Sequence, residues 1–260
     1  MKNFEIICDV TCDLNKELQE RFDIKVMNGY IKGPDGNEVV STCNWDSEEQ
    51  AVAFYTDLKK NPKGYSSAPA SPDEVAVYMN EVIEAGQNNI LFLTISSGLS
   101  GTFNFVNAAK EIVLEKHPEA NIQVVDSLRY STAFGLIATK ASELRSEGKS
   151  LDEVYAWVEE NKNCYHQMGS LDDLSFLAKK GRLNNFKAFM GTLVGIKPMG
   201  DFNQNGLTTV IGKAKGMTKA YEAILQYIER TIINPEEQII FVAQTNRKKY
   251  ALEFIELLKA

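Results

Sequence analysis

Short apolar runs and longer stretches of helical periodicity alternate through the first 160 residues of the chain. A buried strand of a parallel sheet is an unbroken apolar run, whereas an amphipathic helix has apolar residues every three or four positions. The apolar runs predict strands at residues 4–8, 24–31, 90–95 and 122–125. The periodic stretches predict helices at residues 14–22, 45–58, 72–86, 105–117, 134–144 and 151–158. This alternation predicts a parallel sheet covered by helices on both faces.

Three of these helices begin at residues that are typical of helix starts. Asp13 precedes the first helix and is predicted to be its N-cap. Ser71 with Glu74, and Ser150 with Glu153, have the three-residue spacing of a capping box, in which each side chain satisfies a backbone N–H of the other residue. The helices that follow are therefore predicted to begin directly after these serines.

The pattern changes after residue 160. Asn203–Gly206 has the composition of a hairpin turn between apolar runs at 199–202 and 207–211. Further helices are predicted from Ser170 onward and at 186–194 and 218–233, with a strand at 238–243 and a terminal helix. The chain is therefore predicted to be an α/β protein of two domains. A domain with the parallel sheet spans residues 1–163, and a smaller α+β domain spans residues 164–260.

The turn after the strand at 90–95 contains Ser96, Ser97, Gly98, Ser100 and Gly101. Free backbone N–H groups and the dipole of the following helix favour an anion at such a junction. Serine and glycine also form ordinary turns, which is the alternative interpretation.

Two other predicted strands end in polar residues. Asp9 follows the first strand, and Asp126 and Ser127 follow the last strand of the sheet. Ligands of parallel sheets bind at the carboxyl ends of the strands. These residues and the serine turn therefore predict a pocket for a small anionic group.

Composition limits the possible functions. The formal net charge of −7 argues against binding to nucleic-acid phosphates, and no apolar run approaches the ~18 residues of a membrane span. The amino terminus leads directly into a strand rather than a signal peptide. The cysteines, which have no CxxC spacing, indicate reduced thiols in the cytoplasm rather than a disulfide or metal site. They are Cys8, Cys12, Cys43 and Cys164.

Seven segments, spread over almost the whole chain, follow the order of motifs in a known family. They are Asp9–Leu14 (family D-S-T-A-D-L), Ser66–Pro72 (T-S-Q-P-S-P), Ile95–Phe103 (I-S-S-G-L-S-G-T-Y), Val125–Ser127 (V-D-S), Leu177–Leu183 (L-K-K-G-G-R-I), Gly195–Pro198 (I-K-P) and Lys213–Gly216 (K-V-R-G or K-I-R-T). The chain thus resembles the DegV family of bacterial fatty-acid-binding proteins.

The resemblance implies that one long-chain fatty acid lies in a tunnel between the two domains, without a cofactor or metal. It implies that the hydroxyls of Ser66 and Ser97 bind the carboxylate. A partner kinase would phosphorylate the bound acid to an acyl phosphate, and Arg182 and Lys215 would face this partner. The protein itself would have no catalytic activity. The full set of implied ligand-binding residues is Ser66, Ser67, Ser96, Ser97, Gly98 and Ser127.

Three features depart from the family pattern. Lys215 stands where the family has an arginine, which keeps the charge but loses a bidentate fork. Ala68 replaces a glutamine. The family's G-x-H-x-G-P-G segment, whose histidine helps to hold the carboxylate, is not found in this sequence.

The alternative function is an enzyme that acts on an acyl or phosphate substrate with Ser97 or Ser100 as nucleophile. Such a nucleophile needs a base nearby, and His117 and His166 are the only histidines. Neither a G-x-S-x-G elbow nor a P-loop is present. Asp9 and Asp13 could suggest a metal pair, but turn and capping roles explain them more simply.

Overall fold

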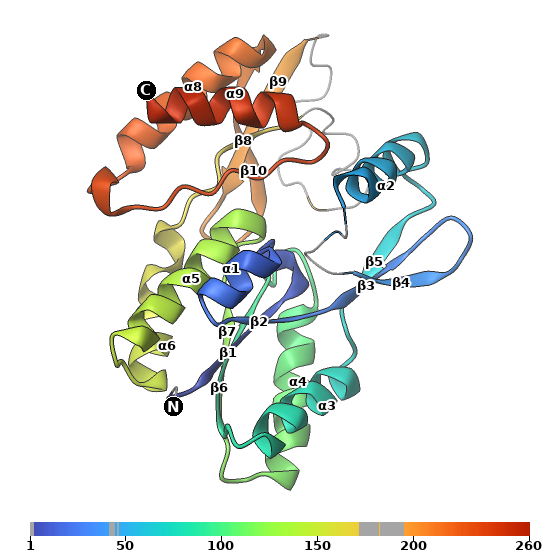
Figure 1. Ribbon diagram of the computed structural model, residues 1–260, viewed down its shortest axis with the longest axis vertical. Helices are drawn as coiled ribbons and strands as arrows, with labels where there is room; N and C mark the ends of the chain where they lie inside the picture. The colour runs from blue at the N-terminus through green and yellow to red at the C-terminus, as the bar shows by residue number, and fades with distance from the viewer. Residues whose placement is uncertain (1–2, 42–44, 46, 172–181, 183–194) are drawn as a thin grey trace. The chain divides into compact units, whose positions relative to one another are not determined.

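The computed structural model describes the chain except residues 1–2, 42–44, 46, 172–181 and 183–194 (Figure 1). The chain divides into two compact units, Met1–Tyr165 and His166–Ala260. Each unit has its own sheet and its own buried cluster of apolar side chains.

A four-stranded parallel sheet forms the centre of the first unit. Its strands, in spatial order, are β2 (Lys25–Met27), β1 (Glu5–Asp9), β6 (Asn89–Thr94) and β7 (Asn121–Asp126). All five residues of β1 and five of the six in β6 are buried, which explains the apolar runs at 6–8 and 90–93 in their centres.

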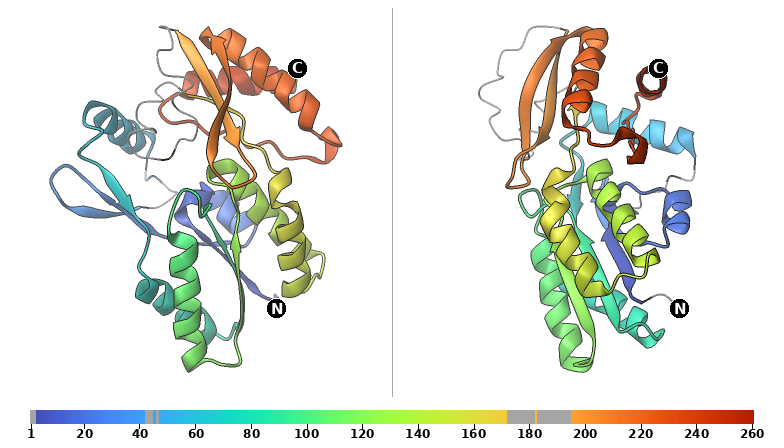
Figure 2. Two further views of the ribbon diagram at one scale, coloured as in Figure 1. Left: turned by 180° about the vertical axis from the view of Figure 1, so that it is seen from behind. Right: turned by 90° about the vertical axis from the view of Figure 1, so that its left-hand side faces the viewer.

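Helices cover both faces of this sheet (Figure 2). Helices α3 (Pro72–Glu84) and α4 (Thr102–Lys116) pack on the face that carries Ile7, Phe92 and Val124. Helices α5 (Ser131–Ser146) and α6 (Leu151–Asn161) contact β1, β6 and β7. The predicted α/β class with a parallel sheet is confirmed. The two predicted capping boxes, at Ser71 and Ser150, are also confirmed.

A second, antiparallel sheet belongs to the same unit. Its order is β4 (Glu38–Ser41), β3 (Gly29–Lys32) and β5 (Ser66–Ala68). The single strand predicted at 24–31 is wrong, because the chain leaves the parallel sheet after β2 and enters the small sheet as β3. Strand β5 was not predicted, since its pairing with β3 is a long-range contact.

Two helices begin later in the chain than predicted. Asp13 is not an N-cap, because its backbone is left-handed (φ 52°) and its carboxylate accepts a hydrogen bond from Ser131. Asn15 caps α1 (Lys16–Arg21) instead, through a 2.9 Å hydrogen bond from Leu18 N. Helix α2 (Glu48–Lys60) begins after its N-cap Ser47, later than predicted.

The second unit contains a three-stranded antiparallel sheet in the order β10 (Thr208–Lys215), β9 (Ile196–Phe202) and β8 (Gly169–Ser170). The hairpin predicted between β9 and β10 is confirmed, and Asn203 Oδ1 accepts the Asn205 and Leu207 N–H groups in its turn. Helices α8 (Gly216–Thr231) and α9 (Lys248–Lys259) complete the unit. Single 3-10 turns lie at Val10–Cys12 (η1), Lys162–Cys164 (η2) and Pro235–Glu237 (η4).

The strand predicted at residues 238–243 is wrong. These residues form neither helix nor strand, and Ile239 and Ile240 are exposed. A β-prone segment becomes a strand only when another strand pairs with it, and no strand does so in the described part of the chain. Ser170 lies in β8 rather than at a helix start, and the helices predicted after it and at 186–194 lie outside the described residues.

A glycine in α5 allows the close packing that positions the first strand's carboxyl end. A Cβ added at Gly135 would lie 2.6 Å from the carbonyl oxygen of Cys12 in η1 and 3.0 Å from Leu14. Real Cβ atoms do not approach a backbone oxygen so closely, so α5 or η1 would have to move.

We therefore expect Gly135→Ala to lower the free energy of unfolding by roughly 1–3 kcal/mol, despite the better helix propensity of alanine. Urea denaturation followed by circular dichroism measures this change. Gly169→Ala is the control, because a Cβ there meets no atom within 4 Å. Equal stability of wild type and Gly135→Ala would show that this contact does not constrain the helix.

Candidate functional site

The carboxyl ends of β1, β6 and β7 lie side by side, because these strands are parallel neighbours. Asp9 Oδ2 accepts the Ile95 N–H at 2.6 Å, and Asp126 Oδ1 accepts the Ser97 N–H at 3.1 Å. Ser127 N–H donates to the carbonyl oxygen of Thr94 at 3.1 Å. The polar residues that the sequence placed after three separate strands therefore meet around one serine turn.

The backbone N–H groups of this turn are hydrogen-bonded within the protein. Besides those of Ile95 and Ser97, the N–H of Gly98 donates to Ser96 Oγ, and the N–H groups of Leu99 and Ser100 donate to Ser96 O. The prediction that they are free to bind an anion is wrong for these residues. The carboxylates of Asp9 and Asp126, whose hydrogen bonds to the turn the sequence could not predict, take two of these donors. Side-chain hydroxyls are therefore the donors that this turn offers to a ligand.

The serines of the turn differ in what they contact. Ser96 and Ser127 are fully buried, and Ser127 Oγ donates to Arg129 O at 3.0 Å. Both side chains therefore support the turn itself. Ser97 is exposed, and its Oγ has no hydrogen-bond partner among the residues that the structure describes. Of these serines, Ser97 is therefore the one whose hydroxyl is exposed and available for a further hydrogen bond.

Ser66 and Ser67 are exposed on β5 and pair with Lys32 and Ile31 of β3. The end of β5 lies close to the segment that follows β1. A Cβ added at Gly29 would lie 3.3 Å from Val10 Cγ1 and 3.4 Å from Ala68 O. Val10 directly follows Asp9, so the small sheet approaches the carboxyl edge of the parallel sheet at this glycine.

Two acidic groups lie at this edge, of which Asp9 is buried and Asp13 is exposed. Burial raises the pKa of Asp9, against the hydrogen bonds from Thr11 and Ile95, and desolvation of the carboxyl group also raises the pKa of Asp13. A bound carboxylate would therefore not meet a basic pocket at this edge. Neutral hydroxyl donors suit such a place better than an ion pair would.

Backbone strain concentrates at the same edge. Asp13, Leu128 and Ser131 have left-handed φ values of 52°, 53° and 53°. Residues with side chains adopt this conformation at a cost of about 1–3 kcal/mol each, and such residues cluster at functional sites. The strain supports a functional role for this edge of the sheet.

The structure does not bring a base to either candidate nucleophile among the described residues. Ser100 Oγ lies 2.8 Å from Thr102 Oγ1. His166 Nδ1 lies 2.8 Å from Asp201 Oδ2 and 2.9 Å from Tyr227 OH. His117, at the end of α4, has its Nδ1 3.6 Å from Glu119. The contacts of His166 were not predictable, because its partners lie on two distant elements, β9 and α8.

Arg182 and Lys215 are both exposed, and Lys215 is the last residue of β10. Lys213 is exposed on the same strand, two positions earlier. Because side chains alternate along a strand, Lys213 and Lys215 lie on one face of β10. The two candidate partner-facing cations therefore come from separate segments, and a second lysine accompanies one of them.

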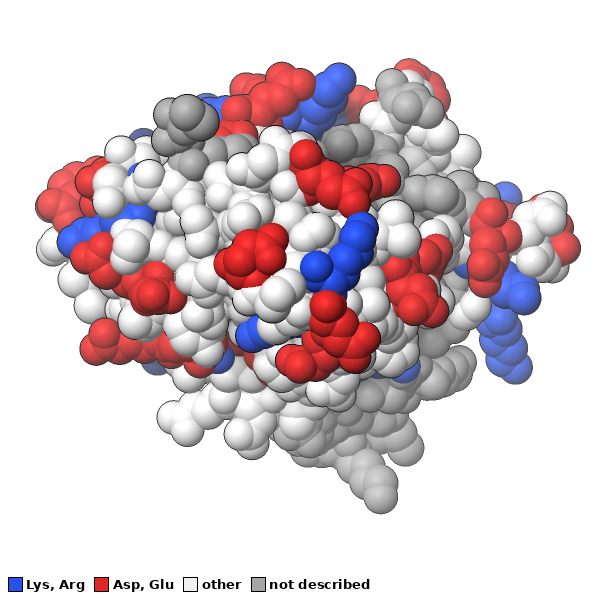
Figure 3. Space-filling view, turned by 90° about the horizontal axis from the view of Figure 1, so that it is seen from below, with Lys and Arg blue, Asp and Glu red and all other residues white. Residues whose placement is uncertain are grey.

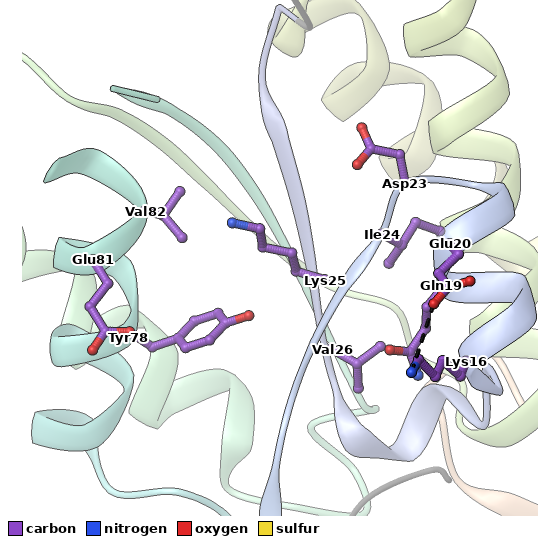
Figure 4. Close-up of a pocket in the computed structure, with 10 residues that line it drawn as sticks. All are labelled: Lys16, Gln19, Glu20, Asp23, Ile24, Lys25, Val26, Tyr78, Glu81 and Val82. Atoms are coloured by element: carbon purple, nitrogen blue, oxygen red, sulfur yellow. Dashed lines mark ion pairs between the residues drawn. The ribbon is translucent and has the colours of Figure 1, made fainter. Parts of the chain in front are cut away.

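A cavity of about 520 Å³ lies elsewhere in the first unit, between α1, β2 and α3 (Figure 4). Lys25 and Tyr78 point into it, and burial raises the pKa of Tyr78 to about 12. None of the predicted ligand residues lines this cavity, and its wall carries charges of both signs, so it does not suit an alkyl chain. Its lining residues are Lys16, Gln19, Glu20, Asp23, Ile24, Lys25, Val26, Tyr78, Glu81 and Val82.

The charged surface agrees with the negative net charge. On the face drawn in Figure 3, acidic side chains outnumber basic ones, and the basic ones do not form a continuous surface. Within the described residues, no three His, Cys, Asp or Glu side chains are grouped to hold a metal ion. No helix in that part of the chain has the length and apolar content to cross a membrane.

Both the sequence and the fold resemble known proteins. A family model described as "Uncharacterised protein, DegV family" matches residues 3–260. A DegV domain-containing protein of Clostridium perfringens is 36% identical over 259 residues, covering 100% of this chain and 87% of that protein.

Two solved structures are similar over almost the whole chain. DegV, a fatty acid binding protein from Bacillus subtilis, has 25% identity and a TM-score of 0.78, covering 100% of this chain and 88% of that one. The Fatty Acid Kinase (Fak) B3 protein of Streptococcus pneumoniae, solved with linoleic acid, has 23% identity and a TM-score of 0.78. That match covers 99% of this chain and 88% of the other.

Proposed function

The chain belongs to the DegV family, and on this premise we propose that it binds one long-chain fatty acid and presents the carboxylate to a partner kinase for acyl phosphate formation. The first domain, residues 1–163, supplies the serine turn, and the second, residues 164–260, closes the lipid tunnel. The protein acts as a carrier and leaves catalysis to the kinase. The similar proteins from B. subtilis and S. pneumoniae, a fatty acid binding protein and a protein loaded with linoleic acid, support this proposal.

The observation that carries the proposal is the arrangement around Ser97. Its backbone N–H is bound by Asp126, while its exposed Oγ has no partner in the described part of the chain. A hydroxyl held in this way can donate to a carboxylate oxygen. Ser66 and Ser67 of β5 are the other proposed donors, with Ser96, Gly98 and Ser127 shaping the turn.

Affinity in this proposal comes from the alkyl chain. Burial of each methylene contributes about 0.8 kcal/mol, so a C16 or C18 chain binds tightly without a strong ionic contact. The head group then needs only to be oriented. Neutral hydroxyls perform this task without leaving a charged protein group buried and unpaired.

The enzyme alternative is less well supported. A serine nucleophile requires a base within hydrogen-bond reach. Neither Ser97 nor Ser100 has a histidine among its partners in the described residues, and Ser100 is paired with Thr102. The carrier therefore explains the exposed hydroxyl with fewer assumptions.

We expect one fatty acid per protein molecule to co-purify from a bacterial expression host. Native mass spectrometry measures the stoichiometry, and solvent extraction followed by denaturing mass spectrometry identifies the chain length. A protein that contains no lipid and does not bind added C14–C18 acids would contradict the proposed function.

We expect Ser97→Ala to weaken fatty-acid binding by roughly 1–3 kcal/mol, because a buried carboxylate oxygen loses its donor. Ser66→Ala should have a similar effect. Isothermal titration calorimetry with oleic acid, starting from delipidated protein, measures both. Ser146→Ala is the control, since Ser146 is exposed at the far end of α5 and bonds only to Ser142 O among the described residues. Unchanged affinity in both pocket variants would place the carboxylate elsewhere.

In this proposal, the exposed cations Arg182 and Lys215 contribute to acyl phosphate formation by the partner kinase. A developing acyl phosphate gains negative charge, which cations at the rim of the site would stabilise. We expect Arg182→Glu with Lys215→Glu to reduce kinase-dependent acyl phosphate formation at least tenfold, while fatty-acid affinity stays within a few-fold. Lys215→Arg should maintain or raise the rate, because a guanidinium binds phosphate in a bidentate manner.

The control for this experiment is Lys219→Glu with Lys249→Glu, a second pair of exposed lysines in the same unit. Acyl phosphate is measured with the cognate kinase alongside fatty-acid binding for each variant. If both double variants retain full turnover, Arg182 and Lys215 are not part of the docking surface.

A further inference from the structure

Arg129, in the loop between β7 and α5, is 3% exposed although its side chain is charged. A buried guanidinium is costly unless its donors find acceptors. Nε donates to Tyr165 O at 2.6 Å, Nη2 to Asn163 O at 3.0 Å, and Nη1 to Leu128 O at 2.8 Å. Two of these acceptors belong to the last residues of the first unit, where the chain leaves it. We call residues 162–165 the connector.

The backbone of Arg129 supports the serine turn. Its carbonyl oxygen accepts the Ser96 N–H at 2.9 Å and the Ser127 hydroxyl at 3.0 Å. Its own N–H donates to Ser127 Oγ at 3.1 Å. Ser96 directly precedes Ser97 and accepts three N–H groups of the turn, two at its carbonyl oxygen and one at its hydroxyl. One residue therefore contacts the turn through its backbone and the connector through its side chain.

The shape of the guanidinium explains why arginine occupies this position. Its planar fork reaches three carbonyl oxygens in different directions, whereas an ammonium is a compact charge and an apolar side chain has no donor. The residue before it, Leu128, is held with a left-handed φ of 53°. Burying the guanidinium and holding Leu128 in a left-handed conformation both cost folding free energy. A loop that only had to pack would not need either feature, which argues for a further role of Arg129.

We propose that Arg129 is a positioning residue that couples fatty-acid occupancy at Ser97 to the order of the connector. This inference rests on the proposed function, in which a carboxylate oxygen accepts the Ser97 hydroxyl. A bound head group restrains the turn, the turn restrains the Arg129 backbone through Ser96, and the guanidinium restrains the carbonyl oxygens of Asn163 and Tyr165. Coupling of this kind is reciprocal, so an ordered connector also raises the affinity for the acid.

Hydrogen–deuterium exchange of a peptide covering residues 160–166 tests this coupling, with and without saturating oleic acid. In the wild type, we expect oleic acid to slow exchange of this peptide at least fivefold. In Arg129→Met, the lipid should no longer slow it, although native mass spectrometry should still find one bound oleic acid at saturation. Oleic acid affinity should fall about three- to tenfold in this variant.

Arg145→Met is the matched control. Arg145 is also buried, on α5, and also donates to backbone carbonyl oxygens, namely those of Phe4, Phe22 and Asp23. These acceptors are not in the connector, so lipid-dependent protection of residues 160–166 should persist. Arg129→Lys retains the charge but donates hydrogen bonds in fewer directions. In this variant, oleic acid should slow exchange of residues 160–166 only partly. It also serves as the test variant if Arg129→Met does not fold.

The outcomes separate the two proposals. If oleic acid binds the wild type without slowing exchange in residues 160–166, or if protection persists in Arg129→Met or in full in Arg129→Lys, the coupling is overturned and the carrier function stands. If Arg145→Met abolishes protection as Arg129→Met does, the effect is one of general stability and the coupling is again overturned. If the wild type binds no fatty acid, both proposals are overturned.

Discussion

Two hydrogen bonds from backbone N–H groups to aspartate carboxylates hold the centre of this protein's candidate site together. Asp9 at the end of β1 binds the Ile95 N–H, and Asp126 at the end of β7 binds the Ser97 N–H. Both carboxylates reach the turn because β1 and β7 flank β6 in the parallel sheet. The position of Ser97 therefore depends on residues about 30 and 90 positions away in the sequence. The strand order, rather than the local sequence of the turn, therefore decides which hydrogen-bond donors of the turn are not used within the protein and can bind a ligand.

Sequence patterns predicted correctly those features that depend on residues close together in the sequence. The capping boxes at Ser71 and Ser150 were predictable because both partners lie within one turn of helix. Strands β1 and β6 were predictable because burial on two faces gives each strand a short apolar run at its centre. Three features differ from the sequence-based expectations because a distant partner decides the outcome. Asp13 bonds to Ser131 instead of capping a helix, β5 exists because β3 pairs with it, and the N–H groups of the turn find aspartates. The sequence placed the candidate site at the strand ends, but it could not distinguish the groups that support the turn from the exposed hydroxyl of Ser97.

In the proposed function, the alkyl chain supplies the affinity and the hydroxyls orient the carboxylate. An ionic head-group site would have to supply both the affinity and the orientation. When a buried ion pair supplies the affinity, chemical change at the carboxylate removes much of the binding energy. When the methylenes supply it, the head group can gain a phosphate while the alkyl chain stays bound. The buried Asp9 and the nearby Asp13, both with raised pKa values, fit this division, since a strongly basic pocket would hold the anion too firmly for transfer.

The unpaired segment at residues 238–243 has a consequence for the behaviour of the protein in solution. Its sequence, Q-I-I-F-V-A, is uncharged and strand-prone, and Ile239 and Ile240 are exposed. Segments of this kind template edge-to-edge aggregation between molecules. Glu236 and Glu237 precede the segment and Arg247 follows it, which is where charged gatekeeper residues are placed in natural sequences. The solubility of the protein therefore depends in part on the charged side chains that flank this segment.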